Sequence, residues 1–289
     1  MSYNIVQKSR QEASVETLCG ALGVSVSGYY AWRSREPSQR EQTDAQLLKH
    51  IQAVYQAGRG IYGSPRIHAA LHEQGLHCSR KRVVRLMQEN GLRSHRRPQR
   101  RVQTTDSRHN RPVAPNLLQR DFSASGLNQK WVGDMVGIWT DEGWLYLAAL
   151  LDTCSRRIIG WAMSLHRDEA LVTDALCMAL AQRNISDPSA LIHHTDRGSQ
   201  YTADDYLALL KEHHIQLSMS NKGDPYDNAM IESFFSTLRA ELTDLQRFPT
   251  RQVARTAVFE FVEVFYNRQR LHSSLGYRSP TQYEAALLS

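Results

Sequence analysis

The sequence predicts a mixed α/β protein in which helical units precede a five-stranded sheet flanked by helices. Apolar residues repeat at helical spacing over much of the first 90 residues, whereas three β-rich runs separated by short turns follow residue 130. Strand and helix patterns then alternate, so the order of elements in the second half is βββαβαβα.

Charge is divided unevenly along the 289-residue chain. Residues 1–120 hold 20 Lys and Arg against 8 Asp and Glu, whereas residues 121–289 hold 15 against 21. A basic front and an acidic back predict polyanion binding at one end and metal chemistry at the other, with an ordinary charge fluctuation as the alternative. The four cysteines are scattered without a CxxC pair, which argues against a zinc site and a disulfide framework. No long apolar run or apolar signal core is present, which predicts a cytoplasmic protein.

The front of the chain is expected to form two helix-turn-helix units, over residues 1–40 and 41–101. In the first, residues 14–34 give a helix, a turn at Gly23 and a second helix capped by Ser25 or Ser27, although a plain helical hairpin would look the same.

In the second unit, residues 44–57 carry a core-facing apolar stripe. Ser64 is the predicted N-cap and Pro65 the first residue of a helix that runs to about Gln74. Ser79 caps a further helix, over residues 80–90.

The helix at 80–90 has a basic face beside an apolar one, as expected of a recognition helix that lies among phosphates. A solvated basic face is the alternative. The basic tract at 93–101 cannot form a core and is expected to follow a nucleic-acid backbone, and residues 102–128 are expected to form a linker. The predicted DNA contacts in this half are Arg66, Arg80, Lys81, Arg82, Arg85, Arg96, Arg97, Arg100 and Arg101.

The second half is divided into a catalytic core at 129–245 and a C-terminal segment at 246–289. The predicted strands are 131–140, 144–151, 156–164, 190–194 and 215–219, and the predicted helices are 168–182, 202–213, 226–243 and 250–266. The tail after residue 266 mixes basic and aromatic residues that would suit packing against the core or against DNA.

Three acids stand out on this framework. Asp134 lies in an otherwise apolar strand, where an unpaired buried carboxylate costs several kcal/mol and a divalent cation is one partner that offsets the cost. Asp196 follows the fourth strand, and Glu232 lies on a later helix with 35 residues between them. If the first and fourth strands are neighbours, the aspartates meet at strand ends, where open sheets collect their chemistry. We expect the three acids to be catalytic and to hold two Mg²⁺ ions, about 4 Å apart, for an in-line displacement at phosphate.

Other polar residues near these acids are expected to have structural roles. Adjacent strand residues point to opposite faces, so at most one of His193 and His194 faces the acids, and packed histidines are favoured. Asp152 is expected to hold a turn or an ion pair, and Asp227 to be the N-cap of the helix that carries Glu232. Predicted DNA contacts in this half are Arg197, Lys222, Asn228, Arg239 (on the Glu232 face of its helix) and Arg270.

Motifs over nearly the whole chain resemble the DDE transposases of the insertion-sequence-3 family, in particular their second-reading-frame product, which is related to retroviral integrases. The matching stretches are Trp131–Asp134, His194–Tyr201, Lys222–Ala229, Glu232–Phe234 and Tyr266–Pro280, together with Ser27–Tyr30 and Tyr62–Arg66.

The resemblance implies an RNase H-like core with Asp134, Asp196 and Glu232 as its metal-binding triad. It implies cutting of double-stranded DNA at inverted-repeat ends, followed by attack of the 3′-hydroxyl on another phosphodiester, with Mg²⁺ or substituting Mn²⁺. A dimer or larger assembly is expected on DNA. The leucine-zipper region of the first-frame product is absent, so that product is expected as a separate or fused partner. The rivals are an RNase H-fold nuclease or integrase of another element, and a non-catalytic DNA-binding regulator.

Overall fold

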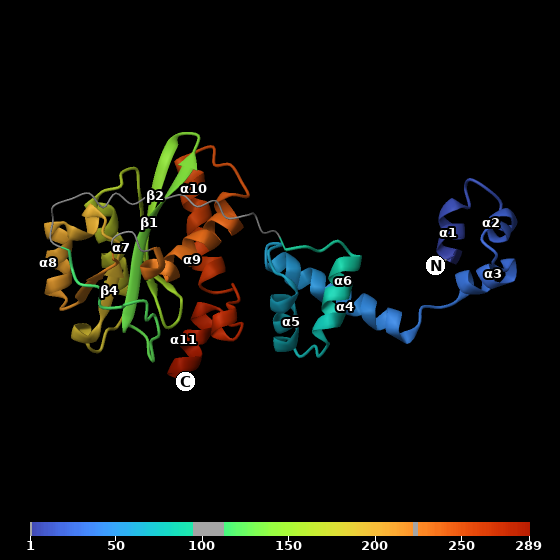
Figure 1. Cartoon of the computed structure of the whole chain (residues 1–289), viewed down its shortest axis with the longest axis horizontal. Coiled ribbons are helices and arrows are strands. Elements are labelled where there is room, and N and C mark those ends of the chain that lie inside the picture. Colours follow the sequence, from blue (N-terminus) through green and yellow to red (C-terminus); the bar gives the residue numbers. More distant parts are fainter. Residues whose placement is uncertain (1, 95–112, 222–224) are drawn as a thin grey trace.

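The computed structural model describes residues 2–94, 113–221 and 225–289 (Figure 1). Its first unit consists of α1 (Ser2–Ser9), α2 (Val15–Ala21) and α3 (Val26–Ser34). The side chain of Ser14 accepts a hydrogen bond from the Thr17 N–H, and Ser25 caps α3 in the same way. The helix-turn-helix expected at 14–34 is therefore present. The sequence did not predict α1, which packs on it through Val6, Cys19 and Tyr29.

A second unit of three helices follows, made of α4 (Gln39–Ala57), α5 (Ser64–Glu73) and α6 (Arg80–Glu89). Ser79 caps α6 as predicted. The prediction for α5 was wrong by one residue: Gly63 is the N-cap, and Ser64 already belongs to the helix. Pro65 fits the first turn because the amide hydrogen it lacks would have no partner there.

This three-helix unit is docked on the C-terminal part of the chain. The Tyr62 hydroxyl donates to the Gln269 carbonyl (3.3 Å) and accepts from the Leu271 N–H (3.0 Å). Arg66 Nε donates to the Leu271 carbonyl at 2.9 Å. One apolar cluster continues from the three helices into the sheet, so the unit shares a core with the second half of the chain.

The sheet has the order β3-β2-β1-β4-β5. β1 pairs antiparallel with β2 and β2 with β3, whereas β1–β4 and β4–β5 are parallel. This mixed five-stranded sheet in βββαβαβα order confirms the RNase H-like fold class. The strands are β1 (Lys130–Thr140), β2 (Gly143–Asp152), β3 (Ile158–Ser164), β4 (Ile192–Thr195) and β5 (Gln216–Met219).

Helices cover both faces of the sheet (Figure 1). Alternation along β1 decides the faces: Trp131 and Met135 join the cluster with α7 and α8, and Val132 and Ile138 the cluster with α9 and α10. These helices are α7 (Glu169–Gln182), α8 (Asp204–Glu212), α9 (Ala229–Leu238) and α10 (Arg251–Phe259).

The two long helices predicted at 226–243 and 250–266 are composites. A 3₁₀ turn precedes α9, and both α9 and α10 continue into π-helical turns, at Arg239–Thr243 and Glu260–Tyr266. Among the described residues, no helix combines the length and apolarity needed to cross a membrane.

One helix in the tail, α11 (Pro280–Leu288), was not predicted. It begins with a capping box between Ser279 and Gln282. Glu284 anchors it to the body of the protein by accepting hydrogen bonds from Arg157 (2.7 Å) and Arg183.

The described part of the expected linker, from residue 113, lies along β5. The Ser218 hydroxyl accepts from the Leu117 N–H (2.9 Å), and the Met219 N–H donates to the Pro115 carbonyl (3.3 Å). Leu118 is buried in the core. This stretch is therefore packed against the sheet at β5.

Candidate active site

Strand register brings Asp134 and Asp196 together. The last paired residues of β1 and β4 are Gly133 and Thr195, and the aspartates are the next residue on each chain. Paired strands lie about 4.8 Å apart, so the two carboxylates meet where β1 and β4 separate. The expected adjacency of the first and fourth strands is confirmed by the sheet order.

Main-chain N–H groups orient both carboxylates. The Met135 N–H donates to Asp134 Oδ1 at 2.7 Å, and the Gly198 N–H donates to Asp196 Oδ1 at 2.9 Å. A Cβ at residue 198 would lie 3.0 Å from Asp196 Oδ1 and 2.9 Å from Gln200 Oε1. Glycine at 198 therefore allows the backbone to approach the carboxylate closely.

Glu232 reaches this edge from α9, which packs against β1. The N-cap of α9 is Asn228, whose Nδ2 donates to the Gly133 carbonyl at 3.2 Å, one residue from Asp134. This bond ties the start of α9 to β1 and so positions the turn that carries Glu232.

The charges of the three acids act on one another. Burial raises the pKa of Asp134 well above its usual range, and the negative charges of Asp196 and Glu232 raise it further. The Met135 N–H and the Arg167 guanidinium act in the opposite direction without cancelling the effect. Burial and two neighbouring carboxylates therefore both disfavour the charged form of Asp134.

Arg167 also belongs to this site and was not predicted from the sequence, whereas Gln200 and Tyr201 lie in the turn that follows Asp196. Gln200 Nε2 donates to the Arg167 carbonyl at 2.9 Å. Burial raises the pKa of Tyr201, and the charges of Asp134 and Asp196 raise it further. Arg167 follows β3, which runs parallel to β1, so the strand-end rule applied to the third strand would have indicated it.

The two histidines before Asp196 are packed. His193 Nε2 is bonded to the Tyr206 hydroxyl (2.6 Å), and His194 Nδ1 to the Ser218 hydroxyl (2.8 Å). Burial lowers the pKa of His193 to about 3 and that of His194 to about 4, so both rings are neutral at pH 7.

Two further acids have structural roles. Asp152 is fully buried and accepts from the N–H groups of Asn128 (2.7 Å) and Ser155 (3.0 Å), in line with the expected turn role. The prediction that Asp227 caps α9 was wrong. Asn228 is the N-cap, and the Asp227 carboxylate accepts from the Asn221 N–H at 2.7 Å.

The predicted DNA contacts are in different surroundings. Arg270 is 6 % exposed and makes two hydrogen bonds with Glu241, of 2.7 and 2.6 Å. Asn228 is 4 % exposed and bonded to β1. Both side chains are therefore almost fully buried and paired within the chain. Arg66 is used in docking the three-helix unit, and Arg197 Nε donates to the Ser220 carbonyl at 2.7 Å.

On α6, Arg80 and Lys81 are exposed. Arg82 and Arg85 are bonded to Asp44 of α4 at 2.5 and 2.6 Å and remain partly exposed. Arg239 is half-buried at the end of α9, two turns beyond Glu232. The remaining predicted contacts, Arg96, Arg97, Arg100, Arg101 and Lys222, lie outside the described residues.

The three acids are also candidate metal ligands. Within the part of the chain that the structure describes, no three or more His, Cys, Asp or Glu side chains are arranged as a group that could hold a metal ion. The adjacent aspartates nonetheless suit Mg²⁺, which binds through one or two carboxylates while water and substrate phosphate complete its shell.

Both halves of the chain match known protein families. The family model "HTH-like domain" matches residues 41–100, and two models named "Integrase core domain" match residues 124–225 and 213–280. The "Transposase InsF for insertion sequence IS3A" of Escherichia coli (strain K12) is 42% identical, with 98% of each chain covered. The chain belongs to the IS3 family of transposases.

Another relative of this transposase is the "Insertion element IS600 uncharacterized 31 kDa protein" of Shigella sonnei, 44% identical over 92% of this chain and 97% of that protein. Among solved structures, a simian T-cell lymphotropic virus intasome has a TM-score of 0.44 at 16% identity, covering 75% of this chain and 70% of that chain. An HTLV-2 integrase catalytic core in complex with magnesium has a TM-score of 0.42 at 15% identity, covering 56% and 99%. The family assignment rests on the sequence relatives.

Proposed function

We propose that this transposase cuts DNA at the inverted-repeat ends of its element and joins the 3′-hydroxyl to DNA, with Asp134, Asp196 and Glu232 as its catalytic, metal-binding acids. The observation that carries the proposal is the register of β1 and β4, which sets the two aspartates side by side. The raised pKa of Asp134 supports it, because burial and the nearby charges of Asp196 and Glu232 make its charged form costly, and a bound cation would offset that cost.

The roles of the residues follow from their contacts. Asp134 and Asp196 would hold Mg²⁺, or Mn²⁺ in its place, through carboxylates whose orientation the Met135 and Gly198 N–H groups fix. Glu232 completes the ligand set from α9. Two ions held there would supply activation of the attacking oxygen and stabilisation of the leaving one in an in-line displacement. The chain itself positions the phosphodiester between these acids and leaves water or a 3′-hydroxyl as the nucleophile.

The basic front half is proposed to hold the DNA. Arg80 and Lys81 are exposed on α6, where they can pair with phosphates in a sequence-independent way. Two ends must be held for joining, so a dimer or larger assembly on DNA is proposed, with the first-frame product as a separate or fused partner. The division at residues 40, 101, 128 and 245 is proposed as the domain organisation.

The test uses purified protein, end-labelled duplex carrying the inverted repeat, and Mg²⁺ or Mn²⁺. Glu232→Gln should abolish nicking and joining while DNA binding is retained. Asp205→Asn, which removes an exposed acid on α8, is the matched control and should keep wild-type activity. If neither the control nor the wild type is active, the first-frame product is added. Activity that survives in the Glu232 variant contradicts the proposed triad.

A further inference from the structure

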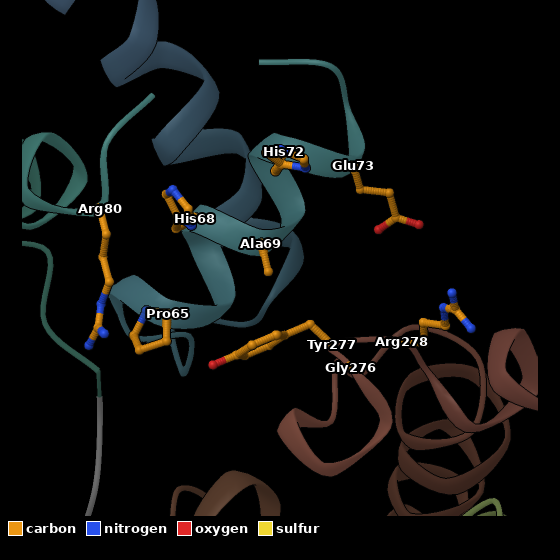
Figure 2. A pocket seen from close by; sticks show the side chains of 9 residues that line it. All are labelled: Pro65, His68, Ala69, His72, Glu73, Arg80, Gly276, Tyr277 and Arg278. Atoms are coloured by element: carbon orange, nitrogen blue, oxygen red, sulfur yellow. The ribbon is translucent and has the colours of Figure 1, made fainter. Parts of the chain in front are cut away.

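A cavity of 520 Å³ lies between the three-helix unit and the tail of the chain (Figure 2). Helix α5 forms one wall, Arg80 at the start of α6 lies at one end, and the turn at Gly276–Arg278 forms the opposite wall. This volume is in the range of about 300–1,000 Å³ typical of ligand sites. The cavity exists because two segments far apart in the sequence are docked together.

The turn that carries Tyr277 has an uncommon backbone conformation. Gly276 (φ 64°) and Tyr277 (φ 61°) are both left-handed, which a tyrosine rarely adopts. The turn is held by the Tyr277 N–H, which donates to the His272 carbonyl at 2.8 Å, and by a β-bridge between His272 and Arg278. The phenol ring lies across the cavity opposite Pro65 (Figure 2). Strained residues that the surrounding structure fixes in this way concentrate at binding sites.

Positive charge is placed on both sides of this ring. Arg80 and Arg278 are exposed at opposite ends of the cavity, and His68 and His72 line the α5 wall (Figure 2). The acid in the lining is Glu73, which accepts a hydrogen bond from Gln282 of α11 at 3.3 Å. The cavity therefore favours an anion that also presents a flat face.

We propose that the cavity binds an unpaired nucleotide of a DNA strand, with the base against the Tyr277 ring and the flanking phosphates on Arg80 and Arg278. Aromatic rings between cations bind single strands without regard to sequence, because every base has a π-face. A paired base would keep its faces inside the duplex stack and leave the ring unused. The inference rests on the proposed function only in taking DNA as the substrate, and an acidic peptide is the rival ligand.

The test compares two probes on the full-length protein without divalent ions, so that no strand is cut. One probe is a blunt inverted-repeat duplex, and the other is the same duplex with a four-nucleotide single-stranded extension. Tyr277→Leu should weaken binding of the extended duplex by roughly 5- to 100-fold, the loss expected for one stacked base, and leave the blunt duplex unchanged. Tyr277→Phe keeps the ring and should bind like the wild type.

The phosphate contact is tested by salt dependence on Arg278, the cavity arginine with no proposed contact to duplex DNA. Arg278→Ala should reduce the salt slope for the extended duplex by about 0.7, from one lost phosphate contact on a single strand. Arg268→Ala, an exposed arginine on the same segment outside the cavity, is the matched control and should leave the slope unchanged. The proposal is overturned if the cavity variants weaken binding of both duplexes equally, or if they change binding of neither. In the second case an acidic peptide would be the remaining candidate ligand. Because binding is read without cleavage, failure here is distinct from failure of the triad.

Discussion

Replacing Arg270 should reduce stability and leave DNA affinity unchanged. The Arg270 and Glu241 side chains are each 7% exposed and share two hydrogen bonds of 2.6 and 2.7 Å. Arg270→Met removes the cation and leaves the Glu241 carboxylate buried without a counter-charge, which costs about 3–5 kcal/mol. At roughly 2–4 °C per kcal/mol for a protein of this size, Tm should fall by about 6–20 °C.

Thermal and urea denaturation of four proteins isolates the pair: the wild type, Arg270→Met, Glu241→Leu and the double variant. The double variant should recover most of the loss, because apolar side chains of similar volume replace the whole ion pair. Arg268→Met changes an exposed neighbour and should leave Tm unchanged. The reasoning is refuted if Arg270→Met keeps the wild-type Tm while the salt slope of DNA binding falls by about one.

Three further outcomes follow from contacts near the site and the tail. Asn228→Ala frees α9 from the Gly133 carbonyl and should lower cleavage by up to about 100-fold in a single-turnover assay, with DNA affinity retained. Burial acts to raise the pKa of Glu284, but the hydrogen bonds from its arginines outweigh burial, so the pKa is lowered. The stability that Glu284 contributes is therefore present above pH 4.5 and is lost as the pH falls below that value. Glu284→Gln should flatten this loss of stability in acid, which denaturation at a series of pH values measures. His193→Leu leaves the Tyr206 hydroxyl unpaired and should cost about 1–3 kcal/mol in urea denaturation, while the Mg²⁺ dependence of cleavage stays unchanged.

The sequence was enough for the order of strands and helices in the second half and for the adjacency of two acids. Strand periodicity and short turns identify β1, β2 and β3 clearly. An aspartate in the apolar strand β1 indicates a functional site, because a buried carboxylate needs a partner. When β1 and β4 pair in parallel with Gly133 opposite Thr195, Asp134 and Asp196 lie side by side. These conclusions depend on local patterns and on one pairing rule.

Predictions about single charged residues did less well, because their partners lie far away in the chain. Nothing around Arg270 indicates Glu241, and nothing around Arg66 indicates the Leu271 carbonyl. Helix α11 could have been found, since Ser279 and Pro280 followed by Gln282 give a capping box with proline in the first turn. The sequence analysis treated these residues as the end of a tail.

The docking of the three-helix unit has a consequence for how this chain can change over evolutionary time. Tyr62 and Arg66 bind main-chain atoms of residues 269 and 271, which every amino acid except proline presents in the same way. Mutations that alter the side chain at 269 therefore keep the hydrogen bonds made by Tyr62 and Arg66, and no compensating change at these two residues is needed. A three-helix unit that keeps this tyrosine and arginine, together with the apolar residues of the shared core, could be exchanged between relatives without other changes at residues 269 and 271.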